Sequence, residues 1–421
     1  MRAPTRTIAA LGVTSALLGL MYWSARKHRN PVLSVNCDAD LESLMPSLAG
    51  VSLGHCIDGN ALRLLQNGEF FDVLLDRIRS ARRTVHFETF LWKDGVLGRR
   101  LAQALSERAR AGVRVRMTLD ARGCSGMGSE VRRQLEGAGC RLAWFHSFSL
   151  SNLGVLNDRD HRKLVVIDGR EAFVGGHCIV DSWQGDAEDG CHYADLSVHL
   201  RGPIVNVVQS AFSENWGGET GEMLLGDDCF PRLERAGDTP VFAAFVKPER
   251  SAPAVKLLHH AAICLAKRRL WIQNPYFIPE PEAIDALGEA VRRGVDVRVL
   301  MPSTGGSDNP MVQHAGHRNF ERLLRLGVRL FEYPHTLLHQ KVMTVDGTWS
   351  AIGSSNFDDR SFEINDEITL GILDRDLASQ LDAVFERYAA RAHELDAERW
   401  SRRGAWHKLK DNTFYLANEL L

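Results

Sequence analysis

Two copies of the pattern H-x-K-x4-D lie far apart in the chain, and each sets a base beside a cation. The copies are His161, Lys163 and Asp168, and His339, Lys341 and Asp346. The period of two places His and Lys on one face of an extended segment, which we expect to be a strand. An imidazole can attack phosphorus or carry a proton near neutral pH, and an ammonium can hold phosphoryl oxygens. The pattern therefore predicts chemistry at a phosphodiester.

The segments that must position these residues also occur twice. The expected strand, helix and strand are Thr84–Leu91, Gly98–Gly112 and Val113–Asp120 in the first half, and Arg269–Phe277, Glu282–Gly294 and Val295–Met301 in the second. Short apolar runs that alternate with amphipathic segments are typical of an α/β fold. Because order and spacing repeat together, we predict an internal duplication, with two halves that each contribute one motif.

Each motif continues into an Asp-Gly pair, which is typical of a tight turn after a strand. We expect Asp168 and Asp346 to brace that turn, so that their role is structural support. Gly175-Gly176 in the first half and Gly353-Ser354 in the second follow the next predicted strand. Small residues there indicate that another group comes close to the backbone.

Composition and breaks in the pattern predict four segments. These are an apolar N-terminal segment, residues 1–30; a first half, 31–235; a second half, 236–399; and a basic and aromatic tail, 400–421. The boundary between the halves falls where Gly, Asp and Pro accumulate, at Gly226–Pro240. The tail mixes Arg and Lys with Trp, Phe and Tyr, which suits either a membrane surface or docking on the core.

The N-terminal apolar run, Ile8–Trp23, has basic residues on both sides and indicates a signal peptide or a single membrane anchor. Trp23 disfavours cleavage at the small residues that follow it, so we expect a retained anchor. Basic residues on both flanks leave its orientation open.

The charge balance and the cysteine pattern argue against two other kinds of protein, those that bind nucleic acid through a general positive charge and those built around a zinc-cysteine site. The 51 Lys and Arg nearly balance 53 Asp and Glu, which gives no general attraction to nucleic acid. The 8 cysteines contain no C-x-x-C, so we expect reduced thiols and no zinc-cysteine site.

His314 and His317 lie one helical turn apart, which suits a metal, but no third ligand is evident. The glycine-rich segment Gly123–Ser129 lacks a phosphate-loop pattern and predicts a plain loop. We predict no metal and no cofactor.

The motifs resemble the phospholipase D superfamily, and in detail they look most like bacterial cardiolipin synthases. The similarity covers roughly residues 60 to 390. The segments that carry it are FETFLWKDGVLGRRLAQAL (Phe87–Leu105), HRKLVVIDGREAFVGG (His161–Gly176), IQNPYFIP (Ile272–Pro279) and LHQKVMTVDGTWSAIGSSNFDDRSFEINDE (Leu338–Glu367). The resemblance implies two phospholipase D-like α/β/α sandwich halves related by a pseudo-twofold axis.

The resemblance also implies roles for residues. His161 would be the nucleophile that forms a phosphohistidine, and His339 the acid and then the base, although the symmetry of the pair allows the reverse. Lys163 and Lys341 would hold the phosphoryl oxygens. Supporting positions would be Asn356 and Ser354 in GSSN, and two acids that orient the imidazoles, Asp195 and Glu367. One departure is Cys178, which stands where the family usually has Asn or Ser, and a thiol donates only weakly.

The resemblance implies transfer of a phosphatidyl group from phosphatidylglycerol to a second phosphatidylglycerol, which gives cardiolipin and glycerol. A phospholipase D that uses water as acceptor is the alternative, and a nuclease of the same superfamily is a weaker one. A non-catalytic lipid-binding protein is disfavoured because both His-Lys pairs are intact. The expected partners are phospholipids and a membrane, the bacterial inner membrane, and not nucleic acid.

Overall fold

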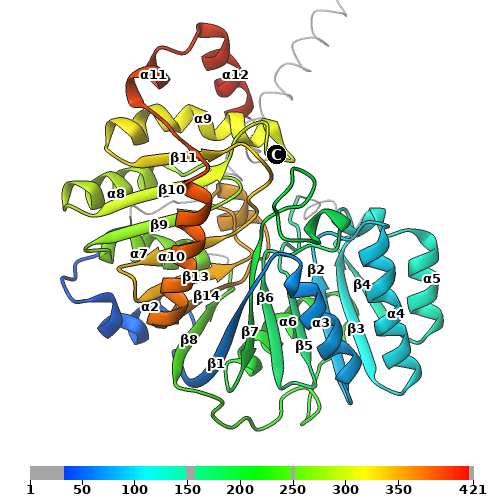
Figure 1. Ribbon diagram of the computed structural model, residues 1–421. Helices are drawn as coiled ribbons and strands as arrows, with labels where there is room; N and C mark the ends of the chain where they lie inside the picture. Colours follow the sequence, from blue (N-terminus) through cyan, green and yellow to red (C-terminus); the bar gives the residue numbers. More distant parts are fainter. Residues whose placement is uncertain (1–32, 148–156, 248–251, 417–421) are drawn as a thin grey trace, which may run out of the picture. The chain divides into compact units, whose positions relative to one another are not determined.

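The computed structural model describes residues 33–147, 157–247 and 252–416 (Figure 1). The chain divides into two units, residues 1–34 and 35–421, and every strand and helix named below belongs to the second. Across the described ranges, no helix has both the length and the apolar character needed to cross a membrane. The predicted N-terminal anchor, residues 1–30, lies outside them.

Among the described residues, fifteen strands form one sheet in which the two halves have the same topology. The first half supplies β1 Ile57–Gln66, β2 Thr84–Thr89, β3 Arg114–Asp120, β4 Arg141–Phe145, β5 Leu164–Ile167, β6 Glu171–Gly175 and β7 Leu196–Arg201. The second half supplies β8 Thr239–Ala244, β9 Arg269–Gln273, β10 Asp296–Pro302, β11 Arg329–Tyr333, β12 Val342–Val345, β13 Trp349–Gly353, β14 Thr369–Leu373 and the short β15 His393–Glu394.

The halves join at the antiparallel pair β1 and β8. Outward from β1 the order is β7-β6-β5-β2-β3-β4, and outward from β8 it is β14-β13-β12-β9-β10-β11, with β15 at the edge. The same order on both sides of one antiparallel pair is what a twofold relation between duplicated halves requires. The predicted duplication is therefore present, but the two sheets are continuous with each other.

Helices cover both faces of each half. The outer face of the first half carries α3 Glu69–Ser80, α4 Val96–Arg110 and α5 Ser129–Gly137, and that of the second carries α7 Ala254–Leu265, α8 Pro281–Arg292 and α9 Pro310–Arg325. A short N-terminal helix, α2 Met45–Val51, packs on the second half although it precedes β1. The remaining helices are α6 Val205–Thr220, α10 Arg375–Ala389, α11 Ala397–Ser401 and α12 Ala405–Tyr415.

A central core joins the halves. It contains Phe212 and Trp216 of α6 together with Leu381 and Phe385 of α10, packed against strands of both halves. Because helices lie on both faces, strands such as β2, β5 and β12 are buried along their whole length. This explains why β5 (LVVI) is a continuous apolar run, whereas in β2 (TVHFET) the polar residues that alternate with apolar ones, such as His86 and Glu88, are also buried.

The predicted strand-helix-strand units are present within a few residues, but the His-Lys segments were placed wrongly in strands. β5 begins at Leu164 and β12 at Val342, so both His-x-Lys triplets precede their strand. The reason lies in the backbone: His161 N donates to Asp366 O at 2.9 Å, and His339 N donates to Ala194 O at 2.7 Å. These bonds cross to the opposite half, so the histidines lie outside the ladders of their own half, and only the lysine carbonyls accept from it, from Gly175 N and Gly353 N at 3.3 Å.

The C-terminal tail packs as a helix along α9 (Figure 1). Its residue Asp411 is 2% exposed, whereas Trp406 is 74% and Leu409 is 56% exposed. One side of α12 therefore docks on the core, and the other presents large apolar side chains to solvent.

Candidate active site

Each motif histidine is held by a carboxylate from the other half. His161 Nδ1 lies 2.7 Å from Glu367 Oε1, and His339 Nδ1 lies 2.7 Å from Asp195 Oδ2. All four side chains are buried. The two imidazoles therefore meet at one seam, where each half supplies one histidine and the carboxylate that orients the other.

These hydrogen bonds define the tautomer of each ring. An ionised carboxylate can only accept, so Nδ1 of each imidazole carries the proton and Nε2 presents its lone pair. Burial raises the pKa of Glu367, but attraction to His161 and the hydrogen bond between them outweigh burial and lower it. Burial also lowers the pKa of His161 to about 4, with Glu367 acting in the opposite direction. His161 is thus neutral and nucleophilic at neutral pH.

The two orienting carboxylates are supported differently. Ser354 Oγ donates to the second oxygen of Glu367. Asp195 instead accepts from Trp183 Nε1 at 2.8 Å and fits directly against Gly176, where an added Cβ would lie 2.2 Å from Asp195 Oδ1. The predicted close approach behind the glycine pair is therefore the approach of the carboxylate that orients His339.

The motif lysines lie beside the rings. Lys163 Nζ donates to His161 O at 2.7 Å, and Lys341 Nζ lies 2.9 Å from Nε2 of His339. Burial and then the charges of both lysines lower the pKa of His339 well below its usual value. Burial and the charge of Lys163 lower the pKa of Lys341 to about 7, against the opposing effect of Asp195. Since charges from both halves act on both rings, the four side chains form one electrostatic unit.

Asn356 and Cys178 occupy equivalent places after β13 and β6. Asn356 lines the cavity beside His161. Cys178 is buried with its Sγ 3.7 Å from Gly176 O, and burial raises the pKa of its thiol to about 11. The second half thus offers an amide where the first offers a neutral thiol, which is a weaker donor.

The motif aspartates lie at the opposite ends of β5 and β12 from the histidines. Asp168 Oδ1 accepts from Arg83 N at 2.7 Å and Thr84 N at 2.9 Å. Asp346 makes the equivalent bonds to the residues that open β9. Both aspartates have positive φ, 53° and 54°, as the first position of a tight Asp-Gly turn requires. The geometry supports a bracing role away from the chemistry.

A cavity of ≈ 830 Å³ opens beside His161 and Asn356. Its apolar lining includes Phe90, whose ring centroid is 4.9 Å from that of His161. The lining residues that the sequence did not single out include Tyr276, Ile278, Met311, Val312, Arg122, Arg159 and Arg360. The cavity therefore combines apolar surface with charged groups of both signs, since Asp94, Asp308 and Asp358 also line it, and its guanidinium groups suit the anionic head of an amphiphile.

Comparison with known proteins agrees with this geometry. The family described as cardiolipin synthase, PLD-like domain, matches residues 74–214 and 260–389, once in each half. Cardiolipin synthase A of Pseudomonas putida is 36% identical over 355 residues, which is 82% of this chain and 71% of that protein. Cardiolipin synthase 2 of Bacillus anthracis is 32% identical over 363 residues, 85% of this chain and 70% of that protein.

Among solved structures, phosphatidylserine synthase of Haemophilus influenzae Rd KW20 has the same fold, with a TM-score of 0.69, at 13% identity over 91% of this chain and 99% of that one. The fold and the paired His-Lys site define an enzyme of the phospholipase D superfamily. Within it, the chain belongs to the PLD-like cardiolipin synthase family and is a cardiolipin synthase-like phosphatidyltransferase.

Several site residues carry no signal in the sequence. Trp183 contacts His339 and its carboxylate but belongs to no motif, and Phe90, which contacts His161, lies in a segment that carries the family resemblance but was given no role there. The crosswise pairing of Asp195 with His339 was also hidden, since it depends on how the halves face each other. The only indication of this pairing in the sequence was that each half carries an acid, Asp195 or Glu367, at a position where the family has one.

Replacing Asp195 with Asn is expected to reduce turnover by about 10²- to 10⁴-fold while the fold is retained. An amide that donates to Nδ1 would stabilise the wrong tautomer of His339, in which Nε2 carries the proton and no longer presents its lone pair. The measurement is kcat for lipid transfer, with circular dichroism as a check of folding. Asp189→Asn, at an exposed carboxylate nearby, is the control. Full activity of Asp195→Asn would contradict the orienting role.

Proposed function

We propose that this enzyme transfers a phosphatidyl group from one phosphatidylglycerol to a hydroxyl of a second, giving cardiolipin and glycerol. The observation that carries the proposal is the pair of neutral imidazoles, each fixed through Nδ1 by a carboxylate of the other half, beside a cavity whose walls carry apolar side chains, guanidinium groups and carboxylates. The relatives named cardiolipin synthase support the choice of lipid.

In the first step, Nε2 of His161 attacks phosphorus and the bond from phosphorus to the glycerol oxygen breaks. His339, protonated at Nε2 in the substrate complex, gives that proton to the departing oxygen. The products are free glycerol and a phosphatidyl group bound to His161. Splitting the displacement in two lowers each barrier, since imidazole is both a good nucleophile and a good leaving group.

In the second step, His339 acts as base. It takes the proton from a hydroxyl of the acceptor, whose oxygen attacks phosphorus as the bond to Nε2 of His161 breaks. This restores both side chains to their starting states. The low pKa of His339 in the free site favours the neutral form that acts as base. To act as acid in the first step His339 must hold a proton on Nε2, which the charge of a bound phosphodiester anion would stabilise.

The charge that develops on the non-bridging oxygens needs fixed donors. Lys163 and Lys341 lie beside the rings, and Asn356 lines the same cavity. In a buried site such donors are worth more than in water and need little reorganisation. The motif aspartates, Asp168 and Asp346, support this arrangement indirectly by bracing the ends of β5 and β12.

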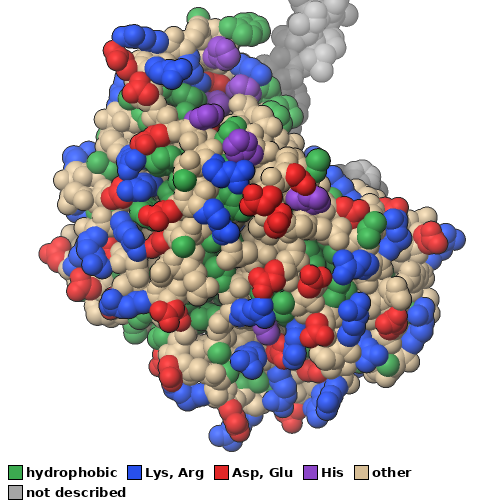
Figure 2. All heavy atoms as spheres, in the orientation of Figure 1, with side chains coloured by type: hydrophobic (Ala, Val, Ile, Leu, Met, Phe, Trp, Pro, Cys, Tyr) green, Lys and Arg blue, Asp and Glu red, His purple; other side chains and the backbone are tan. Residues whose placement is uncertain are grey.

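Surface charge favours a lipid over a nucleic acid. On the face shown in Figure 2, acidic and basic side chains are interspersed, and no extended basic groove is seen. A nuclease acting on a long polyanion would gain from such a groove. The cavity, whose walls are both apolar and charged, is better suited to one lipid headgroup with its acyl chains than to a nucleic acid.

We further propose that the enzyme works at the inner membrane, with residues 1–30 as a retained anchor and α12 on the lipid surface. The exposed side of α12 carries Trp406 and Leu409 beside basic residues such as Lys410. A helix of this kind lies in the interface between headgroups and acyl chains.

Trp406→Ser is expected to weaken binding of the purified protein to vesicles that contain phosphatidylglycerol by several-fold, because an exposed indole is lost from the lipid surface. Co-sedimentation measures the bound fraction. His407→Ser, the next residue on the same helix, is the matched control. Equal binding of wild type and Trp406→Ser would exclude this helix as a lipid contact.

The test of the proposed reaction is incubation of the purified full chain with labelled phosphatidylglycerol, followed by separation of lipids. Cardiolipin and an equal amount of glycerol support the transferase. Phosphatidic acid as the main product would show that water is the acceptor. Unchanged lipid together with cleaved DNA would replace the proposal with a nuclease.

A further inference from the structure

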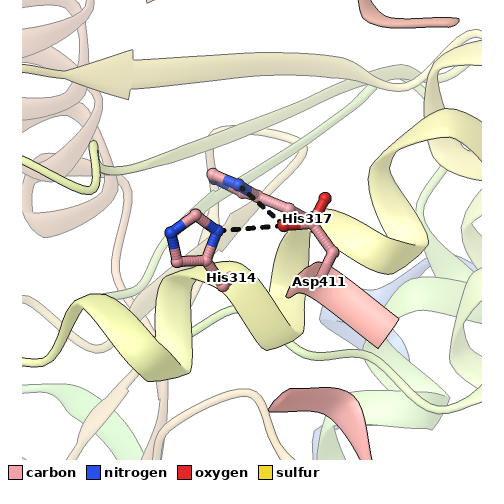
Figure 3. A group of neighbouring side chains, drawn as sticks. All are labelled: His314, His317 and Asp411. Atoms are coloured by element: carbon pink, nitrogen blue, oxygen red, sulfur yellow. Dashed lines mark hydrogen bonds and ion pairs between the residues drawn. The ribbon is translucent and has the colours of Figure 1, made fainter. Parts of the chain in front are cut away.

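A cluster of two histidines and one aspartate lies at the junction of α9 and α12, away from the motif histidines (Figure 3). His314 and His317 come from α9, and Asp411 comes from α12, 97 residues beyond His314. The sequence alone shows the two histidines one turn apart, but it does not show the third group. Figure 3 shows both rings directed at the Asp411 carboxylate.

The distances suit three ligands around one ion. Asp411 Oδ1 lies 2.9 Å from His314 Nδ1 and 3.9 Å from His317 Nδ1, and all three atoms lie within 4.8 Å of one another. Ligands at about 2.1 Å from a tetrahedral Zn²⁺ stand about 3.4 Å apart. Small rotations of the side chains would bring the three atoms to that spacing.

The atoms that face away from the cluster are already held. His317 Nε2 lies 2.8 Å from Glu332 Oε1, so it donates there and leaves Nδ1 as a lone pair that faces Asp411. Arg403 Nη1 donates to Asp411 Oδ2 at 2.9 Å, which leaves Oδ1 to face the rings. Partners of this kind orient metal ligands in protein sites.

When His317 is neutral and no metal ion is bound, one contact in this cluster is unfavourable. The lone pair on His317 Nδ1 and the oxygen of Asp411 would face each other at 3.9 Å, too far apart for a hydrogen bond, with both side chains buried. A metal ion between these two atoms would replace the repulsion with two metal–ligand bonds. The net charge of Asp411, Glu332 and Arg403 is −1, which further favours a divalent ion.

We propose that His314, His317 and Asp411 bind one divalent transition-metal ion of the Zn²⁺ class, which fixes α12 to α9. Two imidazoles and one carboxylate favour such an ion over Mg²⁺ or Ca²⁺, which prefer oxygen ligands. Because α9 also supplies Met311 and Val312 to the wall of the active-site cavity, the ion would fix the C-terminal helix next to the cavity entrance.

The experiment uses the full chain, stripped with a chelator and titrated with Co²⁺ as a spectroscopic probe for Zn²⁺. We expect one equivalent to bind with visible absorption bands of a nitrogen- and oxygen-ligated ion, to be displaced by Zn²⁺, and to raise Tm. His317→Gln and Asp411→Asn should each abolish the bands. Glu332→Gln should weaken binding by about 10- to 100-fold.

His407→Ala, an exposed histidine on α12 outside the cluster, should bind as wild type does. Wild-type protein that binds no stoichiometric Co²⁺ or Zn²⁺ would overturn the proposal and leave a cluster held by hydrogen bonds only. Equal binding by wild type and the Asp411→Asn and His317→Gln variants would also overturn it. These measurements of metal binding do not depend on lipid transfer, so their outcome tests the metal site independently of the proposed function.

Discussion

His161→Ala and His339→Ala are each expected to lower cardiolipin formation by about 10⁴-fold or more, and the double variant should cost little beyond either single one. One histidine forms the bond to phosphorus and the other moves the proton in both steps, so loss of either stops the same reaction. The measurement is kcat/KM with phosphatidylglycerol for both single variants and the double variant.

His55→Ala, at an exposed histidine in the described part of the chain, is the control for general effects of the substitution. Losses in the double variant that equal the product of the single losses would mean that the two imidazoles act independently. A variant of either residue with more than a small fraction of wild-type activity would contradict the two-histidine mechanism.

The rate is expected to depend on pH as a bell whose acid limb belongs to His161 and whose alkaline limb reflects loss of protons from Lys341 and from His339, the acid of the first step. Attack requires neutral His161, and its pKa of about 4 places the acid limb of kcat/KM there. Stabilisation of the phosphoryl oxygens requires charged Lys341, and its pKa of about 7 makes activity fall as pH rises through that value. The first group is active above its pKa and the second below its own.

Lys341→Arg should remove the contribution of Lys341 to the alkaline limb, because a guanidinium stays charged throughout this range, and leave only the contribution of the proton lost from His339. Lys341→Met should cost about 10²- to 10³-fold at neutral pH by removing the charge from a buried site. A pH profile of kcat/KM for the three proteins is the measurement. An alkaline limb that persists unchanged in Lys341→Arg would assign that titration to another group.

The duplication and the motif residues could be predicted because they depend on local pattern. Repeated strand-helix-strand order and two H-x-K-x4-D copies are visible in the chain itself, and their elements appear within a few residues. Apolar continuity in β5 indicates burial on both faces, which the sequence records directly.

Features that arise between halves could not be predicted from the sequence. The His-Lys triplets leave the strand ladder because the backbones of His161 and His339 bond across the seam, and periodicity does not report a partner in the other half. The contact between Asp411 and His317 could not be predicted either, because it joins two helices, α12 and α9, that are far apart in the sequence. Long-range pairing of single polar residues depends on tertiary packing, which overrides local preference.

The central claim is that His161 carries the phosphatidyl group while His339 moves the proton, and an activated substrate separates these roles. A phosphatidyl 4-nitrophenyl ester has a leaving group that needs no protonation. His339→Ala should therefore release one equivalent of nitrophenol in a burst and retain a phosphatidyl adduct that mass spectrometry maps to His161. His161→Ala should give neither. A burst from His161→Ala, with the adduct on His339, would reverse the two roles, and no adduct in either variant would contradict covalent catalysis.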